Sequence, residues 1–136
     1  MDFFGKLLAA RMTFPLFPAK GGSIINIGST VSTPAPADAA FYVGTRGLVD
    51  SILKSMAKEF AAWRISVDGV NPSFVVAEGT RSGGLAGGPF EETVVAFTPL
   101  GRTGELEDIA AAVASLASHE ASGSQGNPVV PRGSAM

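Results

Sequence analysis

Apolar residues recur at helical spacing near the start of the chain, and a short apolar run follows them. Residues 3–12 carry the helical pattern, and Pro15 and Pro18 are expected to end it. Residues 23–27, with the sequence SIINI, are rich in β-branched side chains and have glycines on both sides. This composition is typical of a strand in a parallel sheet that is covered on both faces.

The longest helical pattern in the chain comes next. Asp38 is expected to cap a helix whose apolar stripe runs from Phe41 to Trp63. Residues 64–70, with the sequence RISVDGV, form the next predicted strand, which Pro72 ends because proline cannot continue a hydrogen-bond ladder. A strand, a helix and a strand in this order predict parallel pairing of the two strands.

The second half of the chain is richer in glycine. Residues 73–89 contain five glycines and are expected to form a flexible binding lid, with a short helix over 90–97 after it. Acidic residues from Glu105 onward favour the start of a last helix, and residues 127–130 are expected to add a final strand. The sequence therefore predicts one α/β domain over residues 1–136, with a small parallel sheet of about three strands flanked by helices.

The composition of the chain argues against several classes of binding partner. The 136 residues have a net charge of −2, are 16% charged and contain no basic run, so no nucleic acid and no anionic membrane surface is expected as a partner. The absence of cysteine and the single histidine argue against a metal site. No signal peptide and no apolar run of roughly 20 residues is recognisable, so we expect a cytoplasmic protein.

Three residues are candidates for chemistry. Ser29 follows the first predicted strand, at the carboxyl edge where ligands bind in open α/β sheets. Tyr42 and Arg46 stand at positions i and i+4 of the long helix, so they share a face, and a fixed cation there favours the phenolate form of tyrosine. Tyr42 is therefore a candidate proton donor or acceptor, and Ser29 a candidate ligand of the reacting oxygen. In the alternative reading, Ser29 caps a turn and Arg46 is a solvated residue that pairs with Asp50.

Five segments together resemble the carboxyl-terminal half of a classical short-chain dehydrogenase/reductase. They are GGSIINIGS, YVGTR, ISVDGVNPSFV, PLGR and EDIAAAVASLAS, and they span almost the whole chain. The resemblance implies a partial Rossmann-like fold in three layers and an NAD- or NADP-dependent oxidoreductase that acts on a small carbonyl or alcohol substrate. It also implies a homo-oligomer that pairs through its first helix and the helix that bears Tyr42.

The resemblance assigns a role to each candidate residue. Ser29, Tyr42 and Arg46 take the catalytic positions, and Arg46 stands where the family has lysine. Tyr42 and Arg46 also contact the cofactor, together with Pro72, Ser73 and Val75, which line the nicotinamide. Ser73 replaces a glycine of the family, Ala77 replaces a threonine and Asp2 aligns with an asparagine.

The phosphate-binding part of the family pattern is absent, because no glycine-rich turn of the GxxxGxG kind follows a strand near the start. We therefore expect a truncated enzyme whose activity alone is doubtful. The alternative is a non-catalytic interaction domain that pairs through its two interface helices.

The last residues have two interpretations. Residues 130–134, with the sequence VPRGS, resemble a thrombin cleavage sequence of expression vectors, and residues 130–136 equally suit a divergent natural terminus.

Overall fold

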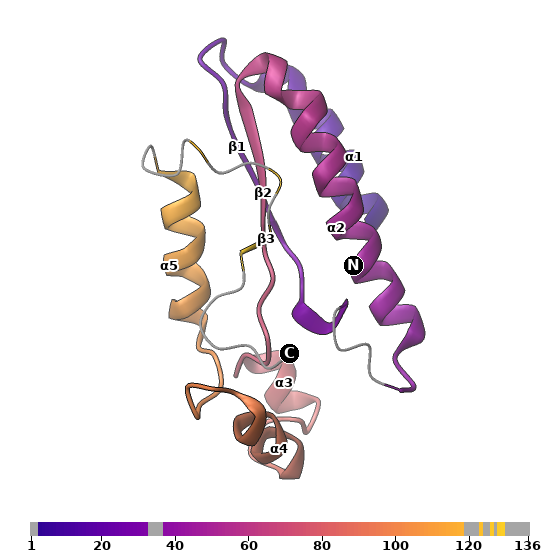
Figure 1. The fold of residues 1–136 in the computed structure, drawn as a ribbon, viewed down its shortest axis with the longest axis vertical. Coiled ribbons are helices and arrows are strands. Elements are labelled where there is room, and N and C mark those ends of the chain that lie inside the picture. The colour runs from indigo at the N-terminus through magenta and orange to yellow at the C-terminus, as the bar shows by residue number, and fades with distance from the viewer. Residues whose placement is uncertain (1–2, 33–36, 119–122, 124–125, 127, 130–136) are drawn as a thin grey trace.

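The computed structural model describes residues 3–32, 37–118, 123, 126 and 128–129, which form three layers (Figure 1). The middle layer is a parallel sheet in the order β1-β2-β3. The strands are β1 Gly22–Ile27, β2 Ile65–Val70 and β3 Pro128–Val129. The α/β class and the parallel pairing predicted from the sequence are confirmed. Asp2 and residues 130–136 lie outside the described part of the chain.

Helices cover both faces of this sheet. The α1 and α2 helices lie together on one face, α5 lies on the other, and α3 and α4 lie beyond the carboxyl ends of the strands (Figure 1). Their bounds are α1 Phe3–Thr13, α2 Ala40–Phe60, α3 Glu78–Ser82, α4 Pro89–Phe97 and α5 Leu106–Ala117. Three short 3₁₀ helices connect these elements: η1 Phe14–Leu16, η2 Thr30–Ser32 and η3 Ala61–Trp63.

The main core lies between the sheet and the α1–α2 layer. Leu53 and Met56 of α2 are buried there against Val67 of β2 and Ala10 of α1. Apolar burial of this kind stabilises a fold by roughly 25 cal/mol for each Å² removed from water. Leu53 and Met56 belong to the apolar stripe that made α2 recognisable in the sequence.

Two local predictions were wrong. Asp38 does not cap α2: it has a φ of +62°, and the N-cap is Ala39, which makes no side-chain capping bond. Residues 73–89 are not simply a loop, because α3 occupies Glu78–Ser82. The Thr80 hydroxyl starts this helix by accepting a bond from the Ala77 amide at 2.9 Å and donating to the Val75 carbonyl at 3.1 Å.

Candidate functional site

The carboxyl ends of β1 and β2 are held together by backbone hydrogen bonds that continue past the strands. The amide of Gly28 donates to the carbonyl of Val70 at 2.8 Å, and the amide of Thr30 donates to the carbonyl of Pro72 at 3.0 Å. Ser29 lies between these two bonds. The segment after β1 and the segment after β2 therefore have a fixed relative position at the ligand-binding edge of the sheet.

A buried side-chain bond fixes α2 against the same edge. The Asn71 amide donates to Asp50 of α2 at 3.0 Å, and Asn71 is 5% exposed. A Cβ atom at position 28 would lie 2.0 Å from Asn71 Oδ1, so only glycine fits there. Since buried polar groups need partners, this bond favours one position of α2 along the sheet, and that position decides where Tyr42 lies.

Ser29 leads into η2, and its hydroxyl accepts a bond from the Val31 amide at 3.3 Å. The turn-capping role expected as an alternative is thus present. Accepting this bond uses a lone pair of the oxygen, so the hydroxyl hydrogen can still be donated to a ligand. Because η2 also contacts α2, the turn brings Ser29 toward the start of the helix that carries Tyr42.

Tyr42 and Arg46 are in contact on α2. The guanidinium carbon of Arg46 lies 4.7 Å from the centre of the Tyr42 ring, which is a cation–π geometry. Arg46 is half-buried, and its Nε atom has no hydrogen-bond partner among the described residues. Arg46 is therefore only partly exposed to solvent.

A large cleft of about 1420 Å³ opens at this edge and extends between β1, α4 and α5. Five of the six predicted site residues line it: Ser29, Tyr42, Pro72, Ser73 and Val75. Arg46 contacts Tyr42 and is not part of the cleft wall. The described residues of the wall include no charged side chain, and many are apolar residues such as Phe74, Ile109 and Val113.

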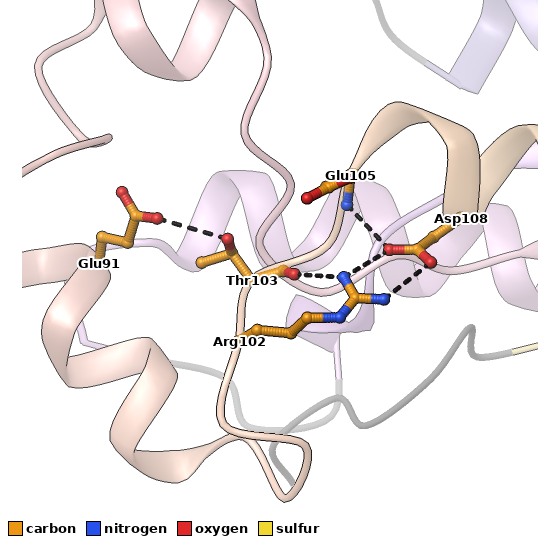
Figure 2. Close-up of polar contacts among 5 residues, drawn as sticks. All are labelled: Glu91, Arg102, Thr103, Glu105 and Asp108. Carbon is orange, nitrogen blue, oxygen red and sulfur yellow. Dashed lines mark hydrogen bonds and ion pairs between the residues drawn. The ribbon is translucent and has the colours of Figure 1, made fainter.

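The far wall of the cleft is fixed by a polar network between α4 and α5 (Figure 2). Arg102 makes a two-pronged contact with Asp108, at 2.7 and 2.9 Å, and donates to the carbonyl of Thr103 at 2.8 Å. Asp108 also accepts a bond from the Glu105 amide at 3.0 Å, and the Thr103 hydroxyl donates to Glu91 of α4 at 3.3 Å. The hydrogen bonds to Asp108 raise the pKa of Arg102 above its usual value. These bonds hold the start of α5 to the segment before it.

The sequence reasoning did not identify Lys6 of α1. Its ammonium donates to the carbonyl of Ile27, the last residue of β1. Burial lowers the pKa of Lys6, Arg46 lowers it further by repulsion, and Asp50 opposes both. A single charged residue within the apolar segment FFGKLLAA was the available signal, because a lysine among apolar neighbours on a packed helix is unusual.

Within the described residues, no helix has the length and apolar character needed to cross a membrane. The same part of the chain contains no cluster of three or more side chains suited to hold a metal ion.

Comparison with known families gives a match over residues 1–131, to the family described as enoyl-(acyl carrier protein) reductase. An uncharacterized oxidoreductase of Methylorubrum extorquens is 44% identical over 121 residues, which is 89% of this chain and 48% of that protein. The chain thus spans about half the length of the curated relatives it matches.

Two solved structures also match almost the whole of this chain and about half of their own. A gluconate 5-dehydrogenase from Burkholderia cenocepacia, in complex with NADP and tartrate, matches with a TM-score of 0.88 and 28% identity, over 96% of this chain and 51% of that one. A short-chain dehydrogenase/reductase from Brucella melitensis matches with a TM-score of 0.86 and 25% identity, over 96% and 51% of the two chains.

Proposed function

Because this chain belongs to the short-chain dehydrogenase/reductase family, we propose that it forms the catalytic half of an NAD(P)-dependent oxidoreductase that interconverts a carbonyl and an alcohol. One observation carries the proposal. Ser29 and Tyr42 come from different elements and line one cleft at the carboxyl edge of the sheet, with Arg46 stacked on Tyr42.

The roles follow from the chemistry of these groups. In the reducing direction, the Tyr42 hydroxyl gives its proton to the substrate oxygen and becomes a phenolate. Ser29 donates a hydrogen bond to the same oxygen and holds it beside Tyr42. The positive charge of Arg46 favours the phenolate, which is needed because an unperturbed tyrosine titrates near pH 10. In the oxidising direction, the phenolate removes the proton from the alcohol.

The described residues suit the nicotinamide end of a cofactor. Pro72, Ser73 and Val75 line the cleft beside Tyr42, and the buried Nε atom of Arg46 is a donor that lacks a partner among the described residues. We assign Tyr42 and Arg46 to the ribose and the other three residues to the nicotinamide ring. A bound NADPH or NADH supplies the hydride. The pyrophosphate needs a glycine-rich strand–turn–helix unit, and we propose that a second half provides it.

The cleft wall suggests the class of substrate. A ligand carboxylate or phosphate would find no opposite charge on the described residues of the wall, and burying an unpaired charge is costly. Carbonyl or alcohol compounds with a large apolar body suit the apolar surface of Phe74, Phe90 and Val113.

The second candidate function is a non-catalytic interaction domain. Phe4, Leu8 and Met12 of α1, spaced one helical turn apart, are 58%, 56% and 73% exposed, and such apolar stripes mark association sites. The stripe equally supports a homo-oligomer of the enzyme. Homo-oligomerisation and a cytoplasmic location stay predictions from the sequence.

The experiment supplies the second half. The part of the Methylorubrum extorquens relative that this chain does not match is fused ahead of it, and oxidation of NADPH and NADH is measured with an apolar ketone. We expect turnover by the fusion and none by the chain alone. Ser29→Ala should lower turnover of the fusion by roughly 10²-fold, a typical effect of losing one donor to the reacting oxygen.

Ser23→Ala is the matched control, because Ser23 lies near the start of β1, at the other end of the strand from Ser29, and its hydroxyl accepts a bond from Ser66 at 3.0 Å. It should leave turnover unchanged. A folded fusion that binds the nucleotide and shows no turnover would favour the interaction domain.

A further inference from the structure

Lys6 is a half-buried cation on a helix face that otherwise packs apolar residues. Its stem lines a small apolar void with Phe3, Leu7, Val49 and Leu53. A methionine has the same reach and would avoid both the desolvation of an ammonium and its repulsion by Arg46. A residue that costs stability at a packed position, where an apolar residue would fit, is often kept for function.

The ammonium is held at one defined place. It donates to the Ile27 carbonyl at the end of β1, two residues before Ser29. The α2 helix packs against α1, and Lys6 lines a small void with Val49 of α2, which is next to Asp50 and one helical turn from Arg46. Arg46 in turn lies over the Tyr42 ring. Lys6 therefore lies against the part of α2 that carries Arg46, and Arg46 contacts the phenol ring.

The net charge of the group formed by Lys6, Arg46 and Asp50 depends on Lys6. From α2, Arg46 contributes one positive charge and Asp50 one negative charge, and from the sheet the Ile27 carbonyl contributes a dipole. Asp50 is shared, because it also accepts the bond from Asn71. With Lys6 protonated, the three side chains carry a net positive charge next to Tyr42. With Lys6 neutral, they carry none.

Arginine cannot adjust its charge in the accessible pH range, whereas a lysine can. We propose that Lys6 is a positioning residue whose ammonium, paired with the Arg46 guanidinium, provides the titratable positive charge that favours the phenolate of Tyr42. The inference deepens the proposed function and rests on it for its meaning in catalysis. The charge coupling itself is a property of the folded chain alone.

Tyr42 is the only tyrosine of the chain, so the ultraviolet absorbance of the phenolate reports its ionisation without interference from another tyrosine. The experiment titrates this absorbance in the 136-residue chain, without cofactor or substrate, for the unchanged chain and for Lys6→Met, Lys6→Arg and Lys20→Met. Lys20 is exposed and precedes β1, at the other end of that strand from Ile27. Its variant removes the same charge far from Tyr42.

The expected order of the Tyr42 midpoints is Lys6→Arg lowest, then the unchanged chain, then Lys6→Met. A nearby positive charge that solvent partly screens shifts a midpoint by roughly half a pH unit, so Lys6→Arg, which stays charged, should differ from Lys6→Met by about that amount. Lys20→Met should titrate with the unchanged chain. A Lys6→Met midpoint equal to or below that of the unchanged chain overturns the proposal, as does an equal shift in Lys20→Met.

A second measurement tests the same coupling if Lys6→Met does not fold. The lysines of the unchanged chain are labelled by reductive ¹³C-methylation and titrated by NMR. Lys6 should titrate below Lys20, and Arg46→Met should raise the Lys6 midpoint because it removes the repelling charge. A Lys6 midpoint unaffected by Arg46→Met overturns the pairing. Both titrations are independent of turnover, so an inactive fusion with the expected midpoints would refute the proposed function and leave the charge coupling in place.

Discussion

The two faces of the sheet differ in how completely they are covered. On the face of α1 and α2, Leu53 is 2% exposed and Val67 is fully buried. On the face of α5, apolar residues line an open cleft, and Leu106 is still 58% exposed. Apolar side chains thus pack the core on the α1–α2 face, whereas on the α5 face they form a surface that suits a ligand.

This difference places the proposed reacting groups where the two environments meet. Tyr42 extends from the packed layer into the cleft, while Arg46 and Lys6 stay behind it on the packed side. Packing and the Asp50–Asn71 bond fix the position of α2, and the open cleft leaves room for a substrate. The comparison predicts that substitutions on the packed face change stability, and that substitutions on the cleft face change binding.

The largest effect on stability is expected from Leu53→Ala. Removing a fully buried leucine side chain costs about 2–5 kcal/mol, because the lost transfer energy adds to the cost of the cavity. Urea unfolding is the measurement. Leu106→Ala, on the exposed cleft wall, should cost less than about 0.5 kcal/mol. Equal effects of the two substitutions would contradict the distinction between the faces.

Asp50→Ala tests the bond that fixes α2. It leaves the Asn71 amide buried without Asp50 as its acceptor, which costs about 1–3 kcal/mol. The control is Glu59→Ala, on the same helix, where the carboxylate accepts an exposed bond from Ser55 at 2.9 Å. Its free energy of unfolding should change by less than about 0.5 kcal/mol.

Val113→Asp tests the cleft face. Val113 lines the cleft from α5, and a carboxylate there places an unpaired charge against an apolar substrate. In the fused enzyme the KM for an apolar ketone should rise by about tenfold, the scale at which single pocket changes act on specificity. An unchanged KM would show that the substrate does not occupy the α5 side of the cleft.

The smallest effect is expected from Arg102→Met. The Arg102–Asp108 pair is exposed, and exposed pairs contribute little to stability. The melting temperature should fall less than in Asp50→Ala, and the difference from the unchanged chain should shrink at high salt because salt screens exposed charges. A fall that is insensitive to salt would indicate that Arg102 acts through packing.

The sequence predicted the elements well where a repeating apolar pattern existed. The spacing of Leu53 and Met56 identified α2, and the run SIINI identified β1. Ser29 was found because it follows a strand, and Tyr42 because of its spacing from Arg46. Each of these signals is local along the chain.

The parts that were missed depend on contacts between distant segments. Asp50 and Asn71 are bonded across 21 positions, and Lys6 bonds Ile27 across the same separation. No periodic pattern encodes such pairs. The α3 helix was missed because glycine composition suggested a loop, while the Thr80 hydroxyl supplies the bonds that start a helix.

The central claim is that Tyr42 transfers the proton in a nicotinamide-dependent reaction. Its most direct test is the turnover of the fused enzyme with Tyr42→Phe, measured together with nucleotide binding. Loss of a proton-transfer group should lower kcat by roughly 10²–10⁴-fold while the fold and the affinity for the nucleotide are retained. Turnover of Tyr42→Phe at the rate of the unchanged fusion would contradict the account.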